Sequence, residues 1–150
     1  MFIPLYDANR LKYIKLQYVT LSLIVLNVMV FGLVALFDPD TQKASMIFGY
    51  IPAVAQGLVV RPPEYDFIAS GWTYITYTFM HADIYHLGGN MLFLWVFGDN
   101  VEDAMGHIKF LIFYFLCGAG GALMHGFVFS DSHGPLIGAS GAIFGVVAAY

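Results

Sequence analysis

From Leu16 to Phe37 the chain reads LQYVTLSLIVLNVMVFGLVALF, a run without a single charged side chain. A helix rises 1.5 Å per residue, so this run would reach about 33 Å, whereas the hydrocarbon core of a membrane is roughly 30 Å thick. The run is longer than the roughly 7–15 apolar residues of a signal peptide, and no small-x-small cleavage site follows it. It therefore predicts a retained transmembrane helix.

The composition of the whole chain points to the same class of protein. Of 150 residues, 59% are apolar and 11% are charged, and the mean hydropathy is +0.74. A soluble domain has roughly 45–50% apolar and about 25% charged residues, so this chain has too few charges to cover a water-facing surface. The net charge of −4 disfavours a nucleic-acid partner. The single cysteine, Cys117, excludes a disulfide within the chain.

Outward from the first run, the sequence predicts further helices and one long connection. Transmembrane helices are expected from about Asp83 to Met105 and from Ile108 to Phe129, and another apolar helical segment starts near Gly138. The connection from Asp38 to about Met80 is interrupted by prolines, so no spanning helix fits there. Its aromatic residues favour either a loop in the membrane interface or a loop packed on its own helices. The predicted fold class is an all-α, polytopic membrane helical bundle.

The last segment and the basic residues predict how this bundle continues and how it is oriented. A helix over Gly138–Tyr150 would reach only about 20 Å, short of a membrane core of roughly 30 Å. Since a helix that ends in lipid leaves carbonyls unpaired, we expect the chain to be the front part of a longer protein. Arg10, Lys12 and Lys15 precede the first helix. The positive-inside rule then predicts a cytoplasmic N-terminus.

Polar residues at membrane depth are candidates for a functional site. His86 and Asn90 are four residues apart, so on a helix they lie about 40° apart on one face and can donate toward one point. The alternative is a pair that only hydrogen-bonds to a neighbouring helix. On a continuous helix His81 would be turned about 140° away from His86, a spacing unlike that of a zinc pair. No metal site is predicted.

A second cluster is Gly138-Ala139-Ser140-Gly141. A serine at the start of a helix can act as a nucleophile, because the backbone N–H groups there favour developing negative charge. Alternatively, Ser140 is one more small residue at a helix contact, since Gly141 and Gly145 form a small-xxx-small face. A nucleophilic serine also needs a base. The chain's other histidines are poor candidates for that base: His107, His125 and His133.

The pattern His81-x4-His86-x3-Asn90, followed by Gly138-Ala139-Ser140-Gly141, resembles that of the bacterial rhomboid intramembrane serine proteases. The spacing Gly98-x3-Glu102-x3-Gly106 and the opening segment of the chain are also similar to that family. The resemblance covers nearly the whole chain and implies the first four of six core helices. Residues 1–15 would be a cytoplasmic N-terminal segment. Residues 16–150 would be a rhomboid domain truncated within its fourth transmembrane helix.

The resemblance also implies roles for individual residues. Ser140 matches the nucleophile of a Ser–His dyad, and His86 and Asn90 match the side chains of the oxyanion hole, helped by the Ser140 backbone N–H. The residues implied to support the site are His81, Gly138, Gly141 and Phe144, and Glu102 matches a structural carboxylate. There are three departures: Thr73 follows Trp72 where the family usually has Arg, Phe144 stands where many members have Tyr, and the dyad histidine belongs to a sixth helix beyond Tyr150.

The function implied is hydrolysis of peptide bonds in or near transmembrane segments of other membrane proteins, without metal or cofactor. The protein would be a multi-pass protein of the cell (inner) membrane, and its partners would be those transmembrane segments and the lipid bilayer. The absent base and the changed Trp-Arg pair leave an alternative, a non-catalytic rhomboid-like protein that binds transmembrane helices. A small transporter or channel is disfavoured, because no acidic or basic residue marks an ion path at mid-membrane.

Overall fold

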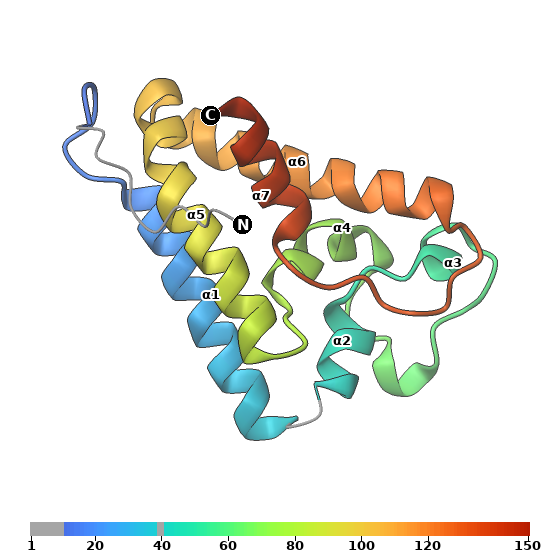
Figure 1. Cartoon of the computed structure of the whole chain (residues 1–150). Helices are drawn as coiled ribbons and strands as arrows, with labels where there is room; N and C mark the ends of the chain where they lie inside the picture. The colour runs from blue at the N-terminus through green and yellow to red at the C-terminus, as the bar shows by residue number, and fades with distance from the viewer. Residues whose placement is uncertain (1–10, 39–40) are drawn as a thin grey trace.

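The computed structural model describes residues 11–38 and 41–150. This part of the chain folds into helices and their connections, which confirms the all-α prediction. The long helices described are α1 (Tyr18–Phe37), α5 (Ile84–Met105) and α6 (His107–Val128), and the shorter α7 (Ser140–Ala149) follows them (Figure 1). Their bounds lie close to those predicted. Arg10, used above for orientation, lies outside the described residues.

Among the described helices, α1 and α6 are long and apolar enough to cross a membrane. Helix α5 is as long as α6, 22 residues each, but it carries the polar residues of the candidate site and acidic residues at its end. It lies beside α1 and runs in the opposite direction (Figure 1). That α5 also spans the membrane stays a prediction.

Helix α5 packs against α1, α6 and α7, so it occupies the middle of the bundle. The core around it is apolar and fully buried, with Leu94, Phe110, Tyr114, Ala142 and Val146 at its centre. Helices α6 and α7 come very close: a Cβ built at Gly121 would lie 3.2 Å from the Cα of Gly141. This contact confirms that Gly141 belongs to a close-packed helix face.

The long connection between α1 and α5 is made of short helical turns. They are α2 (Gln42–Phe48), α3 (Pro52–Ala55), η1 (Pro63–Tyr65), η2 (Ser70–Trp72), α4 (Thr73–Thr76) and η3 (Tyr77–Phe79). Since the longest has seven residues, no spanning helix passes through the connection, as predicted. Tyr50 pairs with Leu136 through both backbone groups, at 3.0 and 2.7 Å, and Arg61 donates to the Ile47 carbonyl at 3.0 Å. The connection thus packs on its own bundle, while several apolar side chains stay exposed, among them Leu58, Val60, Phe67 and Trp72.

At the opposite end of the bundle, two consecutive carboxylates of α5 hold the start of α1. Glu102 is fully buried and accepts hydrogen bonds from the Val19 and Thr20 backbone N–H groups, at 2.9 and 2.8 Å. It also accepts from the Thr20 hydroxyl at 2.7 Å and lies 2.5 Å from His107 Nδ1. Since α1 has no side-chain cap of its own, Glu102 satisfies N–H groups that would otherwise lack partners. The structural role implied for Glu102 is confirmed.

Asp103 extends this contact to the segment before α1. Its carboxylate accepts from the backbone N–H groups of Lys12, Tyr13 and Ile14, at 2.8, 2.7 and 2.8 Å. The two carboxylates therefore fix the approach of the chain into α1 as well as the helix start. This end of the bundle is built separately from the end where α5 and α7 begin, which carries the candidate site.

Candidate active site

The first turn of α5 is fixed by its N-cap residue, Asp83. The Asp83 carboxylate accepts hydrogen bonds from the backbone N–H groups of Tyr85 and His86, at 2.8 and 2.9 Å. Such a cap satisfies donors that have no partner within the helix and fixes where the helix starts. His86 and Asn90 follow one turn apart, so both side chains project from the same face of α5.

His81 lies against both of these residues. Because α5 begins only at Ile84, close to the predicted start, His81 precedes the helix, and the angle of about 140° that holds for a continuous helix does not apply to it. The two imidazole rings are 5.1 Å apart, centroid to centroid, and His81 Nε2 lies 3.0 Å from Asn90 Nδ2. An amide nitrogen only donates, so Nε2 accepts and the His81 proton resides on Nδ1.

The environment of His81 keeps this arrangement intact at neutral pH. The residue is 3% exposed. Burial, and to a lesser extent the neighbouring His86, lowers the pKa of His81 to about 4. The ring therefore stays neutral and continues to accept from Asn90. The second N–H of the Asn90 amide remains free of this bond and can donate elsewhere.

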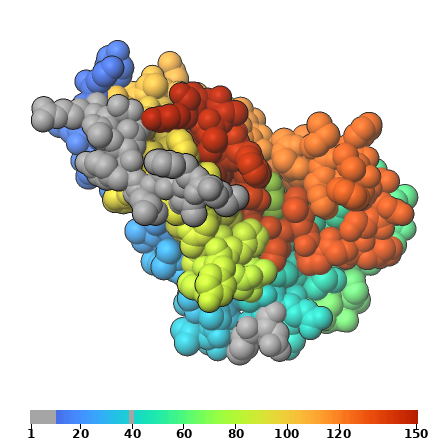
Figure 2. Space-filling model, in the orientation of Figure 1, coloured from blue at the N-terminus to red at the C-terminus, as the bar shows by residue number. Residues whose placement is uncertain are grey.

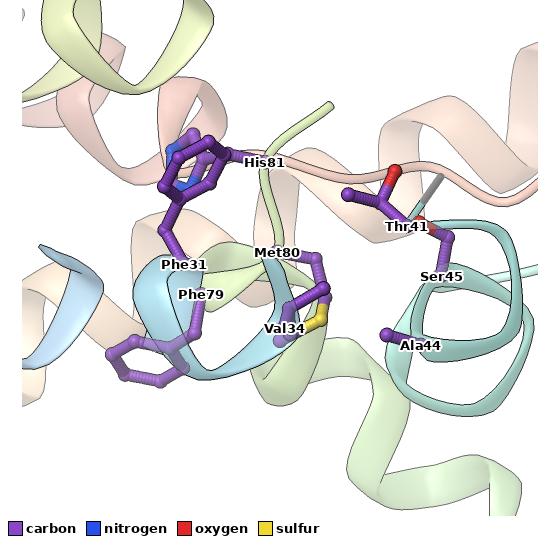
Figure 3. Close-up of a pocket in the computed structure, with 8 residues that line it drawn as sticks. All are labelled: Phe31, Val34, Thr41, Ala44, Ser45, Phe79, Met80 and His81. Carbon is purple, nitrogen blue, oxygen red and sulfur yellow. The ribbon is translucent and has the colours of Figure 1, made fainter. Parts of the chain in front are cut away.

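His81 also lies between Asn90 and residues of α1. On its other side is a small pocket, lined by residues of α1, of the start of α2 and of the segment before α5 (Figure 3). The lining residues besides His81 are Phe31, Val34, Thr41, Ala44, Ser45, Phe79 and Met80. Apolar packing behind the ring thus supports the side that faces Asn90.

Gly138 brings the chain that enters α7 against the polar residues of α5. Its φ is +116°, a conformation that side-chain-bearing residues rarely adopt. A Cβ built at this position would lie 2.6 Å from His86 Nε2 and 3.6 Å from Asn90 Nδ2. Only glycine therefore fits here, and both donors meet the backbone two residues before Ser140.

Ser140 is the first residue of α7, and its helix start lacks a side-chain cap because the N-cap residue is Ala139. The first backbone N–H bonded within the helix is that of Ile143, which reaches the Ala139 carbonyl at 3.0 Å. The N–H groups before it favour an anion at this point. Ser140, His86 and Asn90 line one cleft of about 320 Å³.

The rest of the cleft is apolar or small. Its other lining residues are Tyr85, Gly89, Phe93, Ile143, Phe144 and Val147. Helices α5 and α7 pack against each other, and parts of both are visible on the face shown in Figure 2. Phe144 is 74% exposed, so most of its ring is not in contact with other described residues. The arrangement offers a hydroxyl and several N–H donors in a largely apolar groove.

Other residues singled out in the sequence lie elsewhere. His107 pairs with Glu102 at the far end of the bundle, the His125 ring lies tilted against the Phe129 ring at 5.0 Å between centroids, and His133 is exposed in the turn before α7. In place of the usual Arg, Thr73 is buried and donates its hydroxyl to the Ser70 carbonyl at 2.6 Å. Within the described residues, no group of three or more His, Cys, Asp or Glu side chains could hold a metal ion.

The sequence profile of the Rhomboid domain matches residues 69–150, which is more than half of the chain. The chain belongs to the rhomboid family. Among similar proteins, the Rhomboid protease GluP of Bacillus subtilis (strain 168) is 42% identical over 88 residues, covering 57% of this chain and 17% of that protein. Rhomboid-like protein 11, chloroplastic, of Arabidopsis thaliana is 36% identical over 77 residues, covering 51% of this chain and 27% of that protein.

A third relative, Rhomboid protein 1, mitochondrial, of Saccharomyces cerevisiae, is 34% identical over 89 residues, covering 57% of this chain and 26% of that protein. The chain thus spans about a quarter or less of the length of these relatives. The rhomboid match begins at residue 69 and therefore includes every residue of the cleft. Tyr50, Arg61 and the whole of α1 precede it.

Proposed function

We propose that this rhomboid protein is an intramembrane serine endopeptidase that cleaves transmembrane or membrane-proximal segments of other membrane proteins. One observation carries the proposal: Ser140 at the uncapped start of α7 shares a cleft with His86 and Asn90. A hydroxyl next to convergent N–H donors suits acyl transfer, because the tetrahedral intermediate places a negative charge on the former carbonyl oxygen. A relative of this chain is named a rhomboid protease.

In this mechanism the Ser140 Oγ attacks the scissile carbonyl carbon, and a base removes the hydroxyl proton. The oxyanion is held by the His86 ring N–H, by the free N–H of the Asn90 amide and by the Ser140 backbone N–H. The intermediate collapses, the peptide nitrogen takes the proton from the base and leaves, and Ser140 remains acylated. Water then attacks the ester in the same way and releases the carboxylic acid.

The base is assigned to a histidine that follows Tyr150 in the complete protein. All five histidines of the chain lie in the described part, and two of them, His81 and His86, have the supporting and donor roles given above. The other three do not line the cleft that contains Ser140. We accordingly propose that residues 1–15 are a cytoplasmic segment and that residues 16–150 are the first four helices of a rhomboid domain.

The proposed setting is the cell (inner) membrane, with the N-terminus in the cytoplasm and the cleft near the outer surface. Single cysteines introduced at Ser132 and Ala104, in a Cys117→Ser background, test this orientation. In intact cells an impermeant maleimide should label position 132 but not position 104. Labelling of position 104 alone would show the opposite orientation, and it would leave the chemistry of the cleft unaffected.

The decisive experiment on the activity replaces Ser140 by alanine in the full-length protein, reconstituted in liposomes with a single-span model substrate. The wild-type protein should cleave the substrate and react with a fluorophosphonate, and Ser140→Ala should do neither while folding equally well. Ser130→Ala, a serine in the exposed turn before α7, is the matched control and should keep both properties. Cleavage by the Ser140→Ala variant would contradict a serine mechanism.

A second candidate function is binding of transmembrane helices without cleavage. It is favoured by one observation, that apart from His86 no histidine of the described residues lines the cleft that contains Ser140. Such a protein would capture a transmembrane segment in the same apolar cleft. Wild type and Ser140→Ala would then bind the model substrate equally, and neither would cleave it or react with the fluorophosphonate.

A further inference from the structure

Tyr77, a residue that the sequence did not single out, is wedged between α6 and α7. It is 1% exposed, and its hydroxyl donates to the Gly118 carbonyl of α6 at 2.7 Å. The same oxygen would lie 2.7 Å from a Cβ at Gly141 and 3.2 Å from one at Gly121. The hydroxyl therefore lies against Gly118, Gly121 and Gly141, and the oxygen occupies space that side chains at Gly121 and Gly141 would otherwise fill.

The backbone of Tyr77 makes a second contact with the start of α7. Its carbonyl accepts from the Gly138 N–H at 3.0 Å, and also from the Met80 N–H at 3.1 Å. Gly138 is the residue whose positive φ lets the chain approach His86. Tyr77 therefore touches the chain two residues before Ser140 through its carbonyl and one residue after Ser140 through its hydroxyl.

These two contacts bracket the nucleophile. From them we infer that Tyr77 is a positioning residue, which sets the register of Ser140 against His86 and Asn90 by holding Gly138 and Gly141. This inference rests on the proposed protease function. Tyr77 does not touch the cleft itself, because it is absent from the residues that line it. Its effect on the reaction passes through the placement of Ser140, which must be accurate to well under 1 Å for efficient catalysis.

The test is a double-mutant cycle between Tyr77 and Gly141 in the full-length protein. Tyr77→Phe removes only the hydroxyl, and kcat should fall about tenfold with KM unchanged, since one hydrogen bond and a fixed helix start are lost. Gly141→Ala should also lower kcat, because its Cβ meets the Tyr77 oxygen. In the Tyr77→Phe background that obstacle is gone, so Gly141→Ala should cause little further loss.

Two matched variants separate positioning from general packing. Gly121→Ala places a Cβ 3.2 Å from the Gly141 Cα as well as from the Tyr77 oxygen, so Tyr77→Phe should not rescue it. Tyr50→Phe removes the hydroxyl of a tyrosine that is also 1% exposed and belongs to the same connection, but that contacts α6 at Gly126. It should leave kcat unchanged.

The readouts are kcat, KM and the rate of fluorophosphonate labelling of Ser140, with thermal unfolding in detergent as the check on folding. Equal effects of Gly141→Ala in both backgrounds, or a wild-type kcat for Tyr77→Phe, would overturn the inference. If the wild-type protein itself neither cleaves nor labels, the proposed function fails instead. The Tyr77–Gly141 coupling is then still measured by thermal unfolding, where additive effects would again overturn the contact argument.

Discussion

Replacing Gly138 by alanine should disable the cleft while leaving the bundle folded. The new Cβ would lie 2.6 Å from His86 Nε2, and an ordinary contact begins at 3.4 Å, so ring or backbone must move by about 0.8 Å. The φ of +116° adds backbone strain of about 1–3 kcal/mol. Misplacement by about 1 Å can cost about 10²-fold in rate, and loss of an oxyanion donor costs about 10²–10³-fold. We expect kcat/KM to fall by at least about 10²-fold.

The assay is cleavage of the model transmembrane substrate in liposomes, together with thermal unfolding in detergent. Gly134→Ala is the matched control, because its Cβ would have its nearest neighbour, Ser132 Oγ, at 3.8 Å. That change should alter stability by no more than about 0.5 kcal/mol and leave cleavage intact. The double variant Gly138→Ala, His86→Ala should lose less activity than the two single losses combined, since both changes remove the same donor. A Gly138→Ala protein that cleaves as fast as Gly134→Ala would refute the reasoning.

Three further predictions follow from the contacts of the site and of the far end of the bundle. His86→Ala and Asn90→Ala should each lower kcat by about 10²–10³-fold with folding retained, and wild-type rates in both would leave them only a role in helix packing. The pKa of His81 is lowered to about 4, so between pH 6.5 and 4 the unfolded chain binds a proton at this residue that the folded chain does not. The free energy of unfolding should therefore fall as the pH drops from about 6.5 to 4. Urea unfolding in detergent would measure this pH dependence, which should be weaker in His81→Gln. Glu102→Gln should lower the free energy of unfolding by about 2–3 kcal/mol, because the amide that replaces the buried carboxylate has only one oxygen to accept from the same donors. The cleavage rate per folded molecule should not change, and a slower rate would indicate coupling to Ser140.

The helices were predictable because their signals are local. The helices show as uncharged runs long enough to cross a membrane. Their ends are marked by short local signals, such as the cap at Asp83 and the turn before Ser140. The pairing of His86 with Asn90 was equally accessible, since it depends only on the 3.6-residue period. The period does not apply to His81, because this residue precedes the helix, whose start was predicted near Asp83.

Contacts between distant segments were not predictable. Tyr77 reads as one more aromatic residue of an interfacial loop, and its place between α6 and α7 depends on how the whole connection folds back on the bundle. The same holds for Gly138, whose positive φ is set by the approach of His86 from another helix. A pattern of glycines at Gly118, Gly121 and Gly141 was the only signal that a bulky group lies between those helices, and small residues of this kind usually mean helix contact alone.

The carboxylates of Glu102 and Asp103 have a consequence for the biosynthesis of the protein. They accept from the backbone N–H groups of Lys12, Tyr13, Ile14, Val19 and Thr20, and a ribosome adds them only after the whole of α1 and the long connection have been made. Until then the first turn of α1 has to stay hydrated at the membrane surface. We therefore expect the first turn of α1 to become fully hydrogen-bonded only after α5 has been made, and the contact between α1 and α5 to form before the cleft between α5 and α7 exists.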